Sequence, residues 1–242
     1  MMPSSSIPQT PLSTHLVLVD ALPNEILRPH VRVTPVLKQH LSSGQMNLTA
    51  IINTHHHWDH AGGNDKTLSD FKNLNLKVIG GKDCQSVTST PKHGETFQIG
   101  SGISVKALHT PCHTQDSICW FMQDGDEKVV FTGDTLFIGG CGRFFEGTPA
   151  EMHKALNETL AALPDDTKVY PGHEYTKQNV KFLVTVLQND AVRNLQKFAE
   201  NNEQTQGKFT IGDEKDPVIR KVTSKENPVD VMGALREMKN AM

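Results

Sequence analysis

Short apolar runs separated by polar clusters dominate the first three-quarters of the chain. Their length and apolar, partly β-branched content are typical of strands, which we expect at residues 15–20, 48–54, 77–81, 103–110, 117–123, 128–134 and 168–173. Amphipathic spacing favours helices at about 33–41, 61–72 and 149–162. Strands mixed with helices predict an α/β or α+β fold in which the sheet faces are covered.

The last quarter of the chain changes to a helical pattern. Residues 178–188 and 191–204 have the spacing of two helices, and a further helix is expected from about Val229. We therefore predict a catalytic domain at residues 15–175, followed by a helical substrate-binding domain at residues 176–242.

Composition narrows the class of protein. The 242 residues sum to a net charge of −3, and no apolar run approaches the roughly 20 residues that span a bilayer, so we expect neither a nucleic-acid nor a membrane partner. Four scattered cysteines suit a reducing compartment. Residues 1–14 are rich in Ser and Pro and are expected to be disordered; they contain no basic presequence, which favours the cytoplasm over the mitochondrion.

Histidine is the unusual feature, because the chain has 12 and four of them lie within residues 55–60. In an extended segment, residues two apart point to the same side, so His55 and His57 can share one metal ion. Asp59 and His60 then fall on the turn into the next helix, in position for a second ion. A surface histidine tract that binds metal adventitiously is the alternative for this motif alone.

Three further candidate ligands, His113, Asp134 and His173, each follow a predicted strand. Ligand sites of open α/β sheets gather at the carboxyl ends of strands, so these side chains are expected to meet the histidine cluster. Packing alone does not explain why four strand ends deliver His or Asp.

Together these side chains predict a site for two divalent ions. The ligand triads are His55, His57 and His113 for one ion, and Asp59, His60 and His173 for the other. Asp134 is the bridging carboxylate, because its two oxygens can serve both ions, and Asp59 and Asp134 are also expected to be catalytic. Imidazole and carboxylate ligands accept zinc, iron or manganese, of which we expect zinc.

The chain resembles a known family over residues 48–242, the glyoxalase II or hydroxyacylglutathione hydrolase family of the metallo-β-lactamase fold. The matching stretches are THHHWDHAGGN (54–64), TPCHT (110–114), FTGDTLFIGGCGRFFEGT (131–148) and GHEYT (172–176). The resemblance implies an αββα metallo-β-lactamase sandwich with a C-terminal helical appendage, and a binuclear site. It also implies hydrolysis of S-D-lactoylglutathione to D-lactate and glutathione, the second step of methylglyoxal detoxification.

The substrate of this family is an anionic small molecule, so it needs cationic partners. Arg236 and Lys239 project from one face of the last predicted helix, and in the resemblance they match the glutathione-binding Arg-x-x-Lys of the family. A solvated helix end stabilised by the helix dipole is the alternative. In the resemblance Arg143 and Tyr175 likewise match substrate contacts of the family. We also expect His173 to contact the substrate, and we expect a monomer.

Two departures from the family pattern are visible. Phe145 stands where the family commonly has a tyrosine, so this substrate contact lacks a hydrogen bond worth about 0.5–1.5 kcal/mol. Family members usually open with a two-stranded hairpin before the first helix, whereas only the strand at 15–20 is predicted here.

The ligand set predicts that a metal-bridging hydroxide attacks the thioester carbonyl, and that no side-chain nucleophile is needed. Cys112 and Cys141 are therefore expected to be packing residues. His56 and Trp58 are expected to pack or to support the ligands, and Asp116 is a candidate to orient a ligand imidazole.

Other activities on this fold remain as alternatives: a lactonase, a β-lactamase, or a persulfide dioxygenase with one iron. Asp59 with His60 argues against the one-metal enzyme, and Arg236, Lys239 and Tyr175 favour glutathione over a lactam. An inactive binding protein on the same fold is disfavoured by intact candidate ligands at all seven positions.

Overall fold

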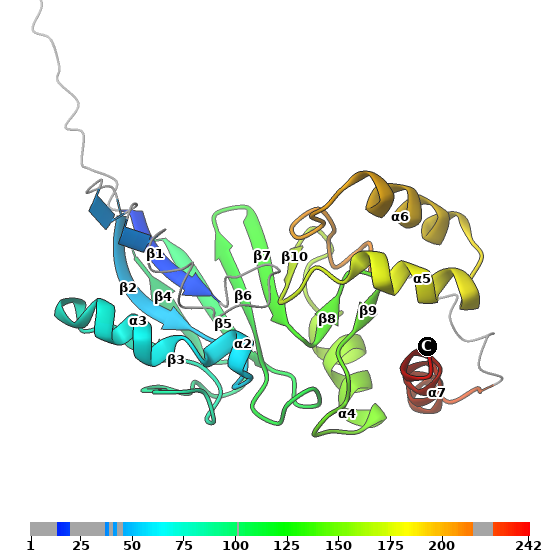
Figure 1. Ribbon diagram of the computed structural model, residues 1–242, viewed down its shortest axis with the longest axis horizontal. Coiled ribbons are helices and arrows are strands. Elements are labelled where there is room, and N and C mark those ends of the chain that lie inside the picture. The colour runs from blue at the N-terminus through cyan, green and yellow to red at the C-terminus, as the bar shows by residue number, and fades with distance from the viewer. Residues whose placement is uncertain (1–13, 20–36, 39–40, 43–45, 101, 215–224) are drawn as a thin grey trace, which may run out of the picture.

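The computed structural model describes residues 14–19, 37–38, 41–42, 46–100, 102–214 and 225–242. In this part of the chain two sheets pack face to face, and helices lie on their outer sides (Figure 1). The expected helix at 33–41 and the missing N-terminal hairpin fall largely outside the described residues, as does the expected disorder of residues 1–14.

The smaller sheet has three parallel strands in the order β1-β2-β3. Its strands are β1 (Thr14–Val19), β2 (Met46–Ile52) and β3 (Lys77–Ile79). Between β2 and β3 the chain runs through α2 (Trp58–Ala61), α3 (Asn64–Asp70) and the 3-10 turn η1 (Lys72–Leu74). Ile51 and Val78 pack with Leu68 and Phe71 on the α3 side, so this helix covers the outer face of the small sheet.

The larger sheet has five strands in the order β10-β7-β6-β5-β4. These are β4 (Thr96–Ile99), β5 (Ile103–His109), β6 (Ile118–Asp124), β7 (Glu127–Gly133) and β10 (Lys168–Pro171). Neighbouring strands are antiparallel except β10, which runs parallel to β7. The carboxyl ends of β7 and β10 therefore lie at the same edge of the sheet.

Alternation along the strands builds the core between and outside the sheets. Ile118 and Trp120 of β6 pack against Ile52 of β2 in the layer between the sheets. Cys119, one residue away on β6, instead packs with Leu160 on the outer face. Successive side chains of a strand point to opposite faces, so one strand supplies both layers. The predicted α/β sandwich is confirmed.

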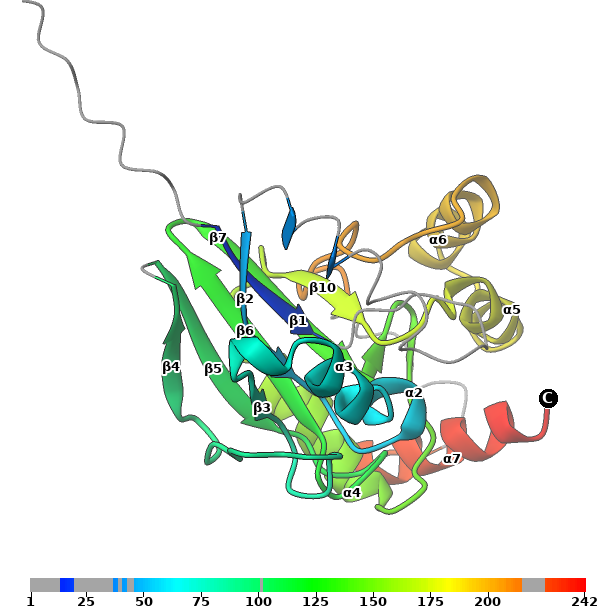
Figure 2. The same ribbon diagram turned by 60° about the vertical axis from the view of Figure 1, so that its left-hand side comes forward.

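The remaining elements lie beside the large sheet and carry the chain to its end (Figure 2). They are the hairpin β8 (Leu136–Phe137) and β9 (Gly140–Cys141), α4 (Pro149–His153) with its π-helical continuation η2 (Lys154–Leu160), α5 (Thr176–Val186), α6 (Asp190–Asn201) and α7 (Pro228–Asn240). Asn227 caps α7 by accepting a hydrogen bond from the backbone N–H of Val229, and Pro228 occupies the first helical position. Helix α7 packs against α4.

The element predictions hold with local differences. The helix expected at 61–72 is found as α3, with the short separate helix α2 before it, and the helix expected at 149–162 changes from α to π after His153. Strands β4, β8 and β9 are not predicted, because two-residue strands have no detectable period and β4 has only two apolar residues. Among the described helices, none combines the length and the apolar character needed to cross a bilayer.

Candidate metal centre

Asn53 holds in place the loop that follows β2 and contains the histidine cluster. Its backbone N–H donates to the carbonyl of Ile79 over 2.8 Å, which continues the pairing with β3 by one residue. Its side-chain amide donates to the carbonyl of His60 over 2.9 Å and accepts from Asn64 over 2.7 Å. The loop is thus held at both ends by a buried residue that the sequence patterns did not single out.

The first ligand triad converges from two loops. His55 Nε2 and His57 Nδ1 lie 3.1 Å apart, and His113 Nε2 lies 3.1 Å from the same His57 atom. His55 and His57 follow β2, whereas His113 follows β5, so the two sheets meet at this point. The three donor atoms form a group suited to one metal ion.

The second triad joins α2 to the segment after β10. His60 Nε2 and His173 Nε2 lie 3.2 Å apart, and His173 Nε2 lies 3.1 Å from Asp59 Oδ2. His60 Nε2 is 3.9 Å from the same carboxylate oxygen. These atoms also form a group suited to one ion.

Asp134 lies between the two triads, immediately after β7. Its Oδ1 is 3.4 Å from His60 Nε2, and its Oδ2 is 3.5 Å from both His113 Nε2 and His173 Nε2. One carboxylate therefore contacts imidazoles of both triads, which is the position expected for a bridging ligand.

Two glycines permit this close approach. A Cβ on Gly172 would lie 2.6 Å from Asp134 Oδ1 and 2.7 Å from the ring of His60. Gly133 has φ +48°, and a Cβ there would lie 2.4 Å from Thr54 Oγ1. A larger residue at either position would push the strand ends apart, so both glycines serve the assembly of the site.

Hydrogen bonds orient two of the ligand rings. The Nδ1 of His113 lies 2.9 Å from the carbonyl of Arg143, and the Nδ1 of His55 lies 3.0 Å from Thr54 Oγ1. When Nδ1 of each ring donates, Nε2 presents its lone pair to the cluster.

Burial sets the protonation of the donors. Desolvation, followed by the neighbouring histidines, holds the pKa of His55 well below its usual range. Desolvation likewise lowers the pKa of His57 and His113. A hydrogen bond from His173 lowers the pKa of Asp59; at Asp134 burial opposes ionisation, but His60 and the other histidines outweigh it and the pKa is lowered. Neutral imidazoles and ionised carboxylates are the forms that bind divalent metals.

The donor spacing also fits metal binding. Ligands about 2.0–2.1 Å from a tetrahedral ion lie roughly 3.3 Å from one another. The donor pairs described above match this spacing: all but one are 3.1–3.5 Å apart, and the remaining pair is 3.9 Å apart. The His and Asp clusters thus indicate a binuclear metal site.

Two aromatic side chains flank the donors. Phe145 is 61% exposed, and its ring centroid lies 5.2 Å from that of His113 and 5.9 Å from that of His57. Tyr175 stacks on His173 with centroids 4.9 Å apart and planes inclined by 17°. Both rings are exposed and lie against donor imidazoles.

The expected cationic residues lie on two sides of β9. Arg143 lies two residues after the end of β9 and is exposed. Arg236 is only 9% exposed, and its Nη1 donates to the carbonyls of Cys141 over 3.3 Å and Gly142 over 3.5 Å. Lys239, one turn later on α7, donates to the side chain of Asn179 on α5. Arg236 and Lys239 are therefore not the solvated helix end considered as an alternative.

Three expectations about neighbouring residues are settled by the contacts. Asp116 does not orient a ligand imidazole in the described structure: it accepts hydrogen bonds from His56 Nδ1 and Thr114 Oγ1, both over 2.8 Å. Trp58 is 62% exposed, and its ring lies against Gly62 at the end of α2, so it packs locally and not in the core. Cys112 is fully buried, and burial raises the pKa of its thiol to about 12, in keeping with a packing residue.

Comparison with known proteins gives two family matches. The metallo-β-lactamase superfamily model matches residues 13–79 and 85–173, and the hydroxyacylglutathione hydrolase C-terminus model matches residues 174–242. The two matches meet directly after His173, between the metal donors and the helices that follow.

Curated proteins and a solved structure agree with these matches. The chain is 51% identical over 218 residues to a probable hydroxyacylglutathione hydrolase of Schizosaccharomyces pombe, covering 86% of this chain and 84% of that protein. It is 41% identical to both the cytoplasmic isozyme and the mitochondrial hydroxyacylglutathione hydrolase of Saccharomyces cerevisiae, covering 86% and 81% of this chain and 86% and 79% of those proteins. The crystal structure of ETHE1 from Myxococcus xanthus superposes with a TM-score of 0.54 at 27% identity, covering 81% of this chain and 84% of that one.

Proposed function

Because the chain belongs to the hydroxyacylglutathione hydrolase family of the metallo-β-lactamase superfamily, we propose that it hydrolyses the thioester of S-D-lactoylglutathione to D-lactate and glutathione. This reaction is the second step of methylglyoxal detoxification. The observation that carries the proposal is Asp134, whose carboxylate contacts imidazoles of both triads.

The seven donors hold the metal ions, in the assignment predicted from the sequence. Two divalent ions bound there would acidify a shared water and polarise the thioester carbonyl, and we propose zinc as the native metal. Asp134 holds the two triads at a fixed separation. Asp59, ionised and hydrogen-bonded to His173, adds negative charge on the α2 side.

The walls of the site bind and orient the thioester. Phe145 and Tyr175 supply aromatic surfaces beside His113 and His173, where an acyl group can pack and exclude bulk water. The leaving thiolate has a conjugate acid with a pKa of about 8.5, so it departs with little need for a side-chain acid.

Arg143, Arg236 and Lys239 are the proposed partners of the glutathione carboxylates. Gly142 links them to the chemistry: its carbonyl accepts from Arg236, and a Cβ at this residue would lie 2.9 Å from His113 Nδ1. The cations and the metal donors are thus neighbours across a single residue of backbone. An anionic tail held by Arg236 places its attached thioester near the donors.

The remaining proposals concern organisation and setting. We keep the catalytic domain at residues 15–175 and the substrate-binding helical domain at 176–242; the family matches that meet after residue 173 support this division. We propose a monomer. We also propose the cytoplasm, on the support of the cytoplasmic yeast relative, while its mitochondrial counterpart is the alternative.

A comparison of kcat/KM for three substrates tests the activity. The purified chain, supplemented with zinc, is given S-D-lactoylglutathione, a β-lactam and a lactone in separate assays. We expect kcat/KM for the thioester to exceed the other two by at least a hundredfold. Equal or preferred hydrolysis of the lactam or the lactone would overturn the proposal.

A further inference from the structure

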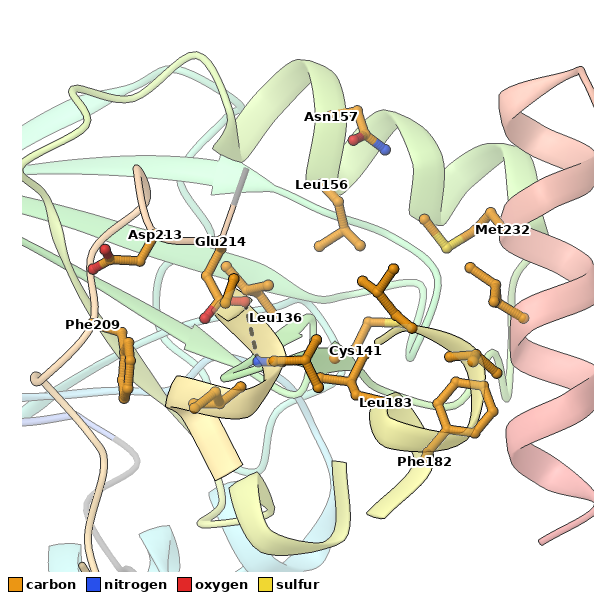
Figure 3. A pocket seen from close by; sticks show the side chains of 18 of the residues that line it. Leu136, Cys141, Leu156, Asn157, Phe182, Leu183, Phe209, Asp213, Glu214 and Met232 are labelled. Atoms are coloured by element: carbon orange, nitrogen blue, oxygen red, sulfur yellow. Dashed lines mark hydrogen bonds between the residues drawn. The ribbon is translucent and has the colours of Figure 1, made fainter. Parts of the chain in front are cut away.

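A cavity lies among the C-terminal helices, apart from the metal donors. It has a volume of about 850 Å³ and is bounded by η2, α5, α6 and α7 and by the β8–β9 hairpin (Figure 3). None of the seven metal donors is among the described residues that line it. The volume falls within the roughly 300–1,000 Å³ that is usual for small-molecule sites.

The walls of this cavity are mostly apolar. Figure 3 shows Leu156 from η2, Leu183 from α5 and Met232 from α7 turned toward a common space. Phe182 and Phe209 extend the apolar lining at its two ends. Such a lining favours an alkyl chain over a polar molecule, because the walls offer few hydrogen-bonding groups.

Acidic groups on the wall are held by the protein itself. Glu214 accepts a hydrogen bond from the backbone N–H of Gly139 over 3.1 Å, and burial raises its pKa to about 7. Asp213 accepts hydrogen bonds from the backbone N–H and the hydroxyl of Thr210. Neither carboxyl requires a cationic ligand.

The cationic groups of the cavity lie together on α7. Arg236 and Lys239 both line it, one helical turn apart. Arg236 is only 9% exposed, and its Nε, which is fully buried, has no hydrogen-bond partner within the described part of the chain. A buried guanidinium with an unused donor favours an anion as the missing partner.

We propose that this cavity binds an amphipathic anion, with its alkyl chain among Leu156, Leu183 and Met232 and its head group at Arg236 and Lys239. The ligand is a single-chain molecule with a carboxylate, sulfonate or sulfate head. Arg236 and Lys239 are also the proposed partners of the glutathione carboxylates, so such an anion competes with the thioester; this consequence alone rests on the proposed function.

Direct binding to the zinc-loaded chain tests the site without turnover. The probes are hexane-, octane- and decanesulfonate below their micellar concentrations, titrated by calorimetry; sulfonates are chosen because they are poor metal ligands. Each buried methylene should tighten binding about fourfold. Decyltrimethylammonium, which has a chain of the same length and the opposite charge, should bind at least tenfold more weakly than decanesulfonate.

A filled cavity provides the matched comparison. Leu183→Trp places an indole ring inside the cavity, whereas Gln178→Trp adds the same ring on the exposed side of the same helix. We expect Leu183→Trp to lose the dependence on chain length and Gln178→Trp to retain it, once thermal unfolding shows both folded. If Leu183→Trp does not fold, the chain-length series in the unaltered protein decides alone.

Flat affinity across the three sulfonates, or equal binding of the cationic probe, would overturn the proposal. Decanesulfonate should also raise KM for S-D-lactoylglutathione without changing kcat. A chain that binds sulfonates by length but does not hydrolyse the thioester refutes the proposed function and keeps the cavity site. A protein that hydrolyses the thioester but binds all three sulfonates equally keeps the proposed function and refutes the cavity site.

Discussion

The Nδ1 of His113 lies 2.9 Å from the backbone carbonyl of Arg143, so the backbone of this residue contacts a metal-donor ring while its side chain is the proposed partner of the substrate. The carbonyl orients the imidazole, and Arg143 itself is exposed. These two roles can be separated by mutation.

Arg143→Ala removes the guanidinium and keeps the carbonyl. We predict unchanged metal content and a KM raised about twofold to tenfold, because an exposed charged contact to the substrate is worth about 0.5–1.5 kcal/mol. Steady-state kinetics and metal analysis on one preparation check this. Loss of a bound ion would show that the side chain, and not the carbonyl, supports His113.

Asp134→Ala removes the carboxylate that contacts both triads. We predict loss of both ions and a fall in kcat of at least a thousandfold, because the histidines are then left without the shared negative charge. Asp126→Ala, in the exposed turn between β6 and β7, is the control and should retain both ions. An Asp134→Ala protein that keeps two ions would contradict the bridging role.

Phe145→Tyr adds a hydroxyl to an exposed ring that already lies 5.2 Å from His113. A gained hydrogen bond of about 0.5–1.5 kcal/mol predicts a KM lowered roughly twofold to tenfold, with little change in kcat. Phe144→Tyr, at the neighbouring and partly buried position, is the control. An unchanged KM in Phe145→Tyr would remove this residue from the substrate contacts.

Glu214 predicts a pH dependence of stability. Its pKa in the folded chain is raised by burial from 4.5 to about 7, so the folded state binds its proton more tightly than the unfolded state does. This contribution to the free energy of unfolding is fully present below about pH 4.5 and is lost as the pH rises through about 7.

Glu214→Gln stays neutral and keeps an acceptor for Gly139. Relative to this variant, the unaltered protein should lose on the order of 2 kcal/mol of stability between pH 4.5 and 7.5. Urea unfolding at both pH values measures the difference. A stability difference that does not change with pH would place the Glu214 carboxyl in water.

The strands and the convergence of the seven donors were predictable because both follow from local rules. Strand periodicity marks the ends of β2, β5, β7 and β10, and a topology of this class brings such ends together. Successive side chains of an extended segment point to opposite sides, so His55 and His57 share a side whereas the neighbours Ile51 and Ile52 face opposite sides.

The supporting contacts were not predictable from periodicity. The contact of Asn179 with Ile138 and the pairing of Asp116 with His56 join residues 41 and 60 positions apart, which no short motif records. The local contact of Asn53 with His60 depends on how the loop after β2 folds, which periodicity does not describe. The large exposure of Trp58 was not predictable either, since an aromatic residue inside a motif is expected to be packed.

Metal reconstitution with turnover recorded on the same sample tests the central claim most directly. The chain is stripped with a chelator, titrated with zinc, and assayed for bound ions and for hydrolysis of S-D-lactoylglutathione after each addition. We predict no hydrolysis in the stripped chain and full hydrolysis as binding reaches two ions per chain. Full hydrolysis by the stripped chain, or saturation of binding below one ion, would contradict the account.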